Sequence, residues 1–240
     1  MSITVQVVGT STPYPRPNNP CSGYLLETAA TRVLADIGLG VWPHLLRYTN
    51  PARLDAIWVS HLHPDHSGDL LAAYQWAANT VGAPRLTVIG PSGWAERIGA
   101  ALPTPNGPAQ LRQLFDVREH TEEITPIGDL ELASLPVQHS VPTHGLRVTH
   151  DMRTFAYSGD SGPGSALARL AENADMFICE AGSTTSNEPY HCSPEDAAHM
   201  AQTAKELAIT HLGTGLTPTE ALRRAGRGVA ARPGLVLRVP

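Results

Sequence analysis

The stretch that decides the fold is His61-Leu-His63-Pro-Asp65-His66, which follows the apolar run Ala56–Val59. Such a run predicts a buried strand, so the polar stretch lies in a tight loop at the strand's carboxyl end. Three imidazoles and one carboxylate can converge there. These groups bind zinc, manganese or iron, and two ligand pairs so close together can serve two adjacent ions. The alternative, a polar loop with chance histidines, is disfavoured by this spacing.

Three further polar residues stand at the ends of predicted strands in the second half of the chain. His139 follows LASLPVQ, Asp160 follows FAYSG, and His211 follows LAIT. Each residue taken alone is more often a hydrogen-bonded structural residue than a ligand. Their recurrence in one local setting favours a shared site at the rim of a sheet.

The order of elements predicts sheet packed against sheet with helices outside, in one domain over residues 1–240. The expected strands are Ile3–Val8, Ser22–Glu27, Arg32–Asp36, Ala56–Val59, Leu86–Gly90, Leu130–Pro136, Gly145–Val148, Thr154–Ser158, Asp175–Cys179, Leu207–Thr210 and Leu235–Val239. The expected helices are Val41–Tyr48, Asp69–Val81, Ser92–Ala101 and Pro163–Ala171, with two more opening at the caps Ser193 and Thr217. The Pro- and Gly-rich segment Leu102–Gln110 is expected to be a surface loop.

Composition narrows the partners and the compartment. The net charge is −5, with 17 Lys+Arg against 22 Asp+Glu, which argues against a broad face for nucleic acid or anionic membrane. The 3 cysteines form no CxxC pair, which favours a reducing compartment. No signal peptide is visible, and no apolar run reaches the roughly 18 residues of a membrane span. We therefore expect a cytoplasmic protein without a membrane partner.

The whole pattern resembles the metallo-β-lactamase superfamily. Supporting stretches are VGTSTPYPRPNNPCSGYLLE, VLADIGLG, FAYSGDSG and MFICEAG. Within the superfamily, NPCSGYLL, SHLHPDHSGDL and FAYSGDSG resemble the branch of ribonuclease Z and its relatives that open cyclic nucleotide phosphodiesters. The resemblance implies an α/β fold, the αββα sandwich, with two mixed sheets packed face to face, helices outside, and a dinuclear metal site between the sheet edges.

The resemblance also implies a set of metal ligands. The first ion would be held by His61, His63 and His139, the second by Asp65, His66 and His211, and Asp160 would bridge them. The cofactors would be two divalent ions, zinc first, with manganese or iron as alternatives. Asp65 could also hydrogen-bond the nucleophile. Asp36 is interpreted either as a residue that orients a ligand or as a turn aspartate that ends a strand.

Proton supply is implied by two further matches to ribonuclease Z. Its His-Glu-Ala-Thr and His-Ser-Thr segments are similar to Cys179-Glu180-Ala181-Gly182 and His191-Cys192-Ser193 here. His191 is therefore the candidate general acid, and Glu180 would hold its tautomer. The alternative is that His191 is a polar residue at the entry of the helix capped by Ser193. Cys192 is interpreted as a packing residue.

Departures from ribonuclease Z bear on the substrate. The interval from His139 to Asp160 has no room for the long basic arm that grips tRNA, and Gly213-Thr214-Gly215-Leu216 replaces the Ser-Arg-Tyr type of stretch expected after the last ligand. These features disfavour tRNA and favour a small-molecule substrate. His144 could line the pocket, and Trp76 is the best candidate for a pocket wall, with core packing as its stronger alternative.

The sequence thus predicts a dinuclear metal-dependent hydrolase, a phosphodiesterase acting on a small phosphodiester such as a cyclic nucleotide. Two alternatives stay open. One is hydrolysis of a lactone, thioester or lactam in a specialised biosynthetic pathway, and the other is tRNA 3′ processing by a ribonuclease Z. A homodimer is a further expectation, because relatives are often dimers.

Overall fold

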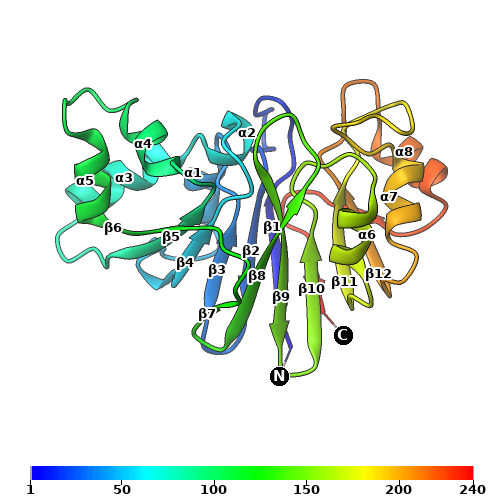
Figure 1. The fold of residues 1–240 in the computed structure, drawn as a ribbon, viewed down its shortest axis with the longest axis horizontal. Coiled ribbons are helices and arrows are strands. Elements are labelled where there is room, and N and C mark those ends of the chain that lie inside the picture. Colours follow the sequence, from blue (N-terminus) through cyan, green and yellow to red (C-terminus); the bar gives the residue numbers. More distant parts are fainter. Residues whose placement is uncertain (1, 240) are drawn as a thin grey trace.

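Two mixed seven-stranded sheets pack face to face in the computed structural model, which describes residues 2–239 (Figure 1). The first sheet has the order β14-β1-β2-β3-β4-β5-β6 and the second β13-β12-β11-β10-β9-β8-β7. The strands of the first sheet are β1 (Thr4–Gly9), β2 (Gly23–Glu27), β3 (Arg32–Ala35), β4 (Ala56–Trp58), β5 (Leu86–Gly90), β6 (Phe115–Glu119) and β14 (Val236–Arg238). Those of the second are β7 (Thr125–Ile127), β8 (Leu130–Val137), β9 (Thr143–His150), β10 (Arg153–Tyr157), β11 (Met176–Glu180), β12 (Glu206–Thr210) and β13 (Val229–Ala230).

Helices cover the outer face of each sheet, which completes the expected αββα sandwich. Figure 1 shows α1, α3, α4 and α5 on one flank and α6, α7 and α8 on the other. The helices are α1 (Val41–Leu45), α2 (Pro64–Ser67), α3 (Leu70–Asn79), α4 (Trp94–Gly99), α5 (Gly107–Leu114), α6 (Ser165–Ala171), α7 (Pro194–Met200) and α8 (Pro218–Ala225), with a 3₁₀ turn at Pro51–Arg53.

The central strands are apolar on both faces because each face meets a different layer. On β4, Ala56 and Trp58 pack into the core between the sheets, whereas Ile57 packs under the helices. On β11, Ile178 faces the other sheet and Phe177 faces the helices. Successive side chains of a strand point to opposite faces, so these strands read as continuous apolar runs.

Parallel pairing brings the carboxyl ends of the key strands to one edge. Strands β3, β4, β5 and β6 pair in parallel in the first sheet, and β10, β11, β12 and β13 do so in the second. The histidine-rich loop follows β4, Asp160 follows β10, and His211 follows β12. The topology therefore gathers the polar strand ends of both halves at the same rim.

The segment Leu102–Gln110 differs from the expectation of a surface loop. Leu102 is buried, and α5 begins at Gly107 with Pro108 in its first turn. Proline suits that position because the first turn needs no backbone N–H donor. A Cβ at Gly107 would lie only 2.0 Å from the Gly99 carbonyl oxygen, so two glycines let α4 and α5 approach closely. In this segment, proline therefore starts a helix and glycine allows that helix to pack closely against α4, where the sequence was expected to form a surface loop.

Short edge strands were also missed. β6, β7 and β13 lie outside the expected strands, since their residues are partly exposed and lack a continuous apolar run. All three cysteines are free and buried, as expected of a chain without disulfides. Among residues 2–239, no helix is both long enough and apolar enough to cross a membrane.

Candidate metal centre

The histidine-rich loop is held in place by its backbone. His63 is the residue before α2, and Pro64 occupies the first turn of that helix. The Asp65 carbonyl accepts a hydrogen bond from Ser22 N–H at 3.0 Å, and the His66 carbonyl accepts one from Ile37 N–H at 2.8 Å. The loop is therefore fixed against the segments that flank β2 and β3, with its side chains directed to the sheet edge.

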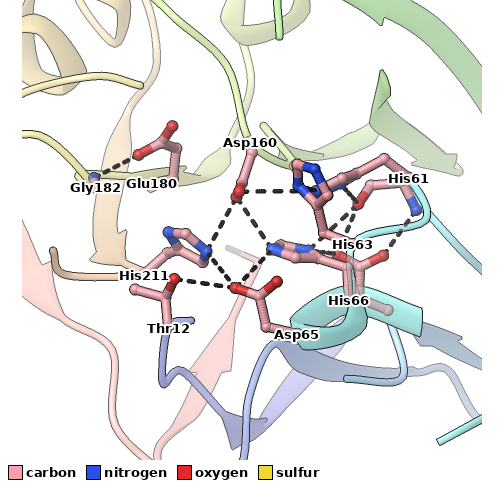
Figure 2. A network of polar contacts seen from close by, with 12 residues as sticks. Thr12, His61, His63, Asp65, His66, Asp160, Glu180, Gly182 and His211 are labelled. Carbon is pink, nitrogen blue, oxygen red and sulfur yellow. Dashed lines mark hydrogen bonds and ion pairs between the residues drawn. The ribbon is translucent and has the colours of Figure 1, made fainter. Parts of the chain in front are cut away.

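The seven residues predicted as metal ligands all meet at this edge, and Figure 2 labels all of them but His139. They fall into two donor groups whose ligand atoms lie within 4.8 Å of one another: His61, His63, His139 and Asp160 in one, and Asp65, His66 and His211 in the other. In the first group, His63 Nδ1 lies 3.0 Å from His61 Nε2 and 3.3 Å from His139 Nε2. Three imidazole nitrogens thus point at one another across a small gap.

Asp160 stands between the two groups, and its oxygens are divided between them. Oδ2 lies 3.8 Å from His61 Nε2 and 3.9 Å from His139 Nε2. Oδ1 lies 3.1 Å from His66 Nε2 and 3.3 Å from His211 Nε2. A carboxylate placed in this way between two donor groups could be shared by two ions.

The charges of the cluster fit divalent metal ions. Burial lowers the pKa of His61, His63 and His139, so that these imidazoles are neutral and offer lone pairs. Burial alone would raise the pKa of Asp160, but the nearby His211 and His66 hold it well below its usual range. His66 Nε2 and Asp160 Oδ1 are buried, and the 3.1 Å contact between them lacks the geometry of a hydrogen bond. Burial would lower the pKa of His66, but the charges of Asp160 and Asp36 raise it well above its usual value. Imidazole nitrogens and carboxylates are the donor types of a zinc, manganese or iron site, and an ion bound there would displace the His66 proton.

The Asp36 carboxylate orients His66 directly and His61 through Ser60. This fully buried carboxylate lies 2.6 Å from His66 Nδ1 and accepts hydrogen bonds from Tyr157 OH at 2.6 Å and Ser60 N–H at 2.7 Å. Ser60 Oγ also donates to it and lies 2.9 Å from His61 Nδ1. The backbone of Asp36 has φ 59°, a strained conformation that the surrounding bonds maintain. Of the two sequence interpretations, the structure supports the orienting role.

Replacing Asp36 by alanine should therefore weaken both folding and metal binding. Removing one member of a buried, charged network costs about 3–5 kcal/mol of unfolding free energy. Loss of a group that orients a ligand lowers metal affinity by about 10- to 100-fold. Urea unfolding and competition against a chromophoric chelator measure the two effects.

Asp55→Ala is the matched control for Asp36→Ala. Its carboxylate accepts a hydrogen bond from the backbone N–H of Arg32 at 2.7 Å in an exposed position, so the substitution should change both quantities little. Equal metal affinity in the two variants would contradict the orienting role of Asp36.

Two other contacts hold would-be ligands in orientation, and sequence reasoning missed both. Thr12 Oγ1 donates to Asp65 Oδ2 at 3.0 Å, as Figure 2 shows. His139 Nδ1 lies 2.8 Å from the carbonyl oxygen of Tyr190, which directs its Nε2 at the cluster. Thr12 lies in the proline-rich loop after β1, where the sequence pointed only to the family resemblance, and a backbone carbonyl leaves no signal in residue type.

His191 and Glu180 lie together at the border of the cluster. His191 Nδ1 lies 2.9 Å from Glu180 Oε1, and a His191 nitrogen also forms a donor group with Asp160 and His211. The Glu180 carboxylate is fully buried and accepts hydrogen bonds from the backbone N–H groups of Ser161 and Gly182. His191 is about one-third exposed, at 34%. The pair therefore lies between the buried donor cluster and the solvent.

The remaining candidates lie elsewhere. Trp76, partly buried on α3, packs against Trp42 with ring centroids 5.6 Å apart and covers the core under the helices, which supports the core alternative for it. The ring of His144 lies against that of His120 at 4.2 Å, and its backbone N–H donates to the Ser60 carbonyl. Cys192 is buried in the core beneath α6 and α7, as its packing interpretation expects.

Two face-to-face sheets with paired His and Asp donor groups at one rim define a metallo-hydrolase of the β-lactamase fold. The Beta-lactamase superfamily domain matches residues 31–236. The chain belongs to the metallo-β-lactamase superfamily, in its ribonuclease Z-like branch.

Similar proteins support this placement. An uncharacterized protein of Mycobacterium tuberculosis is 34% identical over 223 residues, which cover 88% of this chain and 81% of that protein. Ribonuclease Z of Mycolicibacterium paratuberculosis is 29% identical over 262 residues, covering 96% of this chain and 92% of the relative. The crystal structure of the metallo-beta-lactamase fold protein YhfI from Bacillus subtilis has a TM-score of 0.87 at 24% identity, with 99% of both chains covered.

Proposed function

We propose that this metallo-hydrolase is a dinuclear phosphodiesterase that acts on a small phosphodiester such as a cyclic nucleotide. The observation that carries the proposal is the division of the Asp160 oxygens between two donor groups, with the His191–Glu180 pair alongside. Similarity to a ribonuclease Z adds support, because a ribonuclease cleaves phosphodiester bonds. The cytoplasmic location and the homodimer stay predictions from the sequence.

The proposed ligand sets follow the two donor groups. One ion would be held by His61, His63 and His139, the other by Asp65, His66 and His211, with Asp160 shared. Zinc suits these donors, and manganese or iron would also be accepted. When bound, two such ions supply positive charge that polarises a phosphodiester and makes water a better nucleophile.

The protein's own residues would orient the nucleophile and supply the proton. Asp65, held by Thr12, can accept a hydrogen bond from the attacking water. His191 can donate a proton to the departing oxygen while its Nδ1–H stays bonded to Glu180. Burial lowers the pKa of His191, but the hydrogen bond to Glu180 and its charge outweigh burial and raise that pKa to about 9. The pairing with Glu180 therefore favours the protonated form of His191.

Replacing Glu180 by glutamine should move the alkaline limb of the pH–rate profile to lower pH. A general acid loses activity as the pH rises through its pKa, and Glu180 is what raises the pKa of His191. Removing that charge lowers the pKa, so the loss of activity begins earlier. The measurement is kcat against pH for the wild type and Glu180→Gln. The matched control is Glu195→Gln, whose carboxylate is bonded to Arg224 on the surface, and a limb that stays in place in Glu180→Gln would contradict the pairing.

Two features favour a small substrate over tRNA. Only β9 and β10 lie between His139 and Asp160, as the hairpin Thr143–Tyr157, so this interval holds no projecting arm. The net charge of −5 also gives no excess of cations for a polyanion.

The deciding experiment combines metal analysis with a substrate panel. Protein purified without added metal is analysed for bound ions. It is then assayed against cyclic nucleotides, bis-p-nitrophenyl phosphate, tRNA precursors, and ester, thioester and lactam probes. We expect turnover of the small phosphodiesters that a chelator removes and that His63→Ala lacks. Hydrolysis of carbonyl probes or tRNA without cleavage of small phosphodiesters would overturn the proposal.

A further inference from the structure

A pocket of about 500 Å³ opens directly beside the metal centre. It lies between the loop after β4, the segment from Pro91 to Arg97, and the loop from β8 to β9. His63 belongs both to its wall and to the first donor group. A molecule bound at the metal centre can therefore extend into the pocket, whose volume lies in the range of small-ligand sites, roughly 300–1,000 Å³.

Both apolar and polar side chains line this pocket, and the apolar ones come from both halves of the chain. Leu62 and Pro91 come from the first half of the chain, and Val141 and Pro142 come from the second. These side chains cannot hydrogen-bond, so they suit a flat or apolar group rather than a second phosphate. The opening between two loops of different sheets gives a slot with apolar surface from both halves.

The Arg97 guanidinium in the pocket wall is available to a ligand, because the neighbouring polar side chains are paired with other residues. Glu96, also in the wall, is paired with Arg112 at 2.5 Å, and Ser92 Oγ donates to Glu119 at 2.8 Å. The Arg97 side chain, in contrast, has no hydrogen bond or ion pair within residues 2–239 and is exposed. A guanidinium plane of this kind stacks on heteroaromatic rings and donates to their acceptor atoms.

We propose that this pocket holds the nucleobase of the substrate, between its apolar side chains and the Arg97 guanidinium, while the phosphodiester lies at the metal centre. The inference rests on the proposed function and names its substrate class as a nucleoside phosphodiester of mononucleotide size. The apolar side chains of the pocket would cover the faces of a base, and the Arg97 guanidinium would donate hydrogen bonds to its edge or stack on its ring. His63 joins the two subsites.

Two variants test the pocket, each with its own control. Val141→Phe fills it from one side, and Arg97→Ala removes the cation. Cyclic 3′,5′-AMP is compared with an abasic ribose 3′,5′-cyclic phosphate, which has the same bond to cleave and no base. We expect each variant to raise KM for cyclic AMP about tenfold or more, with kcat within about threefold, and to leave the abasic diester unchanged.

The controls are surface substitutions of the same kind, Val81→Phe and Arg53→Ala. Val81 is fully exposed in the turn that follows α3 and lies outside the pocket wall. Thermal unfolding shows whether the Val141→Phe variant is folded. Arg97→Ala changes an exposed side chain, so it tests the pocket without altering the hydrophobic core. Equal loss on both diesters, or no loss on either, would overturn the nucleobase pocket.

Equilibrium binding separates failure of the pocket from failure of the proposed function. Calorimetry compares AMP with ribose 5-phosphate, which share a phosphate and differ by the base. We expect AMP to bind at least about tenfold more tightly, and Arg97→Ala to remove most of the difference. Absence of hydrolysis with this preference intact would refute the phosphodiesterase alone. Hydrolysis with equal binding of both ligands would refute the pocket alone.

Discussion

Replacing Asp160 by alanine is expected to lower phosphodiester hydrolysis by at least about 10³-fold, or about 4 kcal/mol of transition-state stabilisation. The effect is expected to be large because Asp160 lies between the two donor groups. Oδ1 faces His66 and His211, and Oδ2 faces His61 and His139. One substitution would therefore impair both ion sites at once, and the metal content of the purified protein should fall with the activity.

Two controls separate this effect from general damage. Asp116→Ala removes a partly exposed carboxylate of β6 that pairs with Arg118, and it should retain both metal and activity. Asp160→Asn keeps the shape and one oxygen but removes the charge, so it should hold less metal than the wild type. An Asp160→Ala protein with full metal content and activity within tenfold of the wild type would contradict the bridging role.

His191→Ala is expected to give the second largest loss, and the loss should depend on the leaving group. A positioned general acid contributes about 10²- to 10⁴-fold. Opening a cyclic nucleotide expels an alkoxide-like oxygen that needs a proton, so this reaction should lose the full factor. Bis-p-nitrophenyl phosphate expels a stable phenolate, so its hydrolysis should fall less than about tenfold.

The comparison of the two substrates is the readout that a merely structural role would not produce. Steady-state kinetics on both diesters give the ratio of kcat values. His199→Ala, an exposed histidine on α7, is the matched control and should leave both rates unchanged. Equal losses on both diesters would show that His191 acts on the integrity of the site and not as an acid.

Much of the candidate site could be predicted because its residues stand in short, recognisable segments of the sequence. The cluster His61-Leu-His63-Pro-Asp65-His66 places four donor groups within one loop, and no long-range contact is needed to see them. His139, Asp160 and His211 were found because each ends an apolar strand. The structure confirms that these seven side chains lie together, while their role as ligands stays a proposal.

The fold could be predicted where strands are buried on both faces. Strands such as β4 and β11 contact apolar layers on each side, and the resulting runs are visible in the sequence. The edge strands β6, β7 and β13 and the helix α5 could not be predicted in this way. The residues of β6 and β7 are partly exposed, and the proline that begins α5 carries the same local signal as a turn.

By itself, then, the sequence predicted the superfamily, the αββα sandwich and the seven side chains that gather at the rim, because residue type and strand burial are properties of short segments. Only the tertiary structure decided how those donors are oriented and what lies beside them. Tyr157 reaches Asp36 across 121 positions of the chain, and the pocket is closed by Leu62 and Val141 from opposite sheets. Such contacts depend on which strands pair and which loops meet at the rim, and no local pattern of residues encodes that pairing.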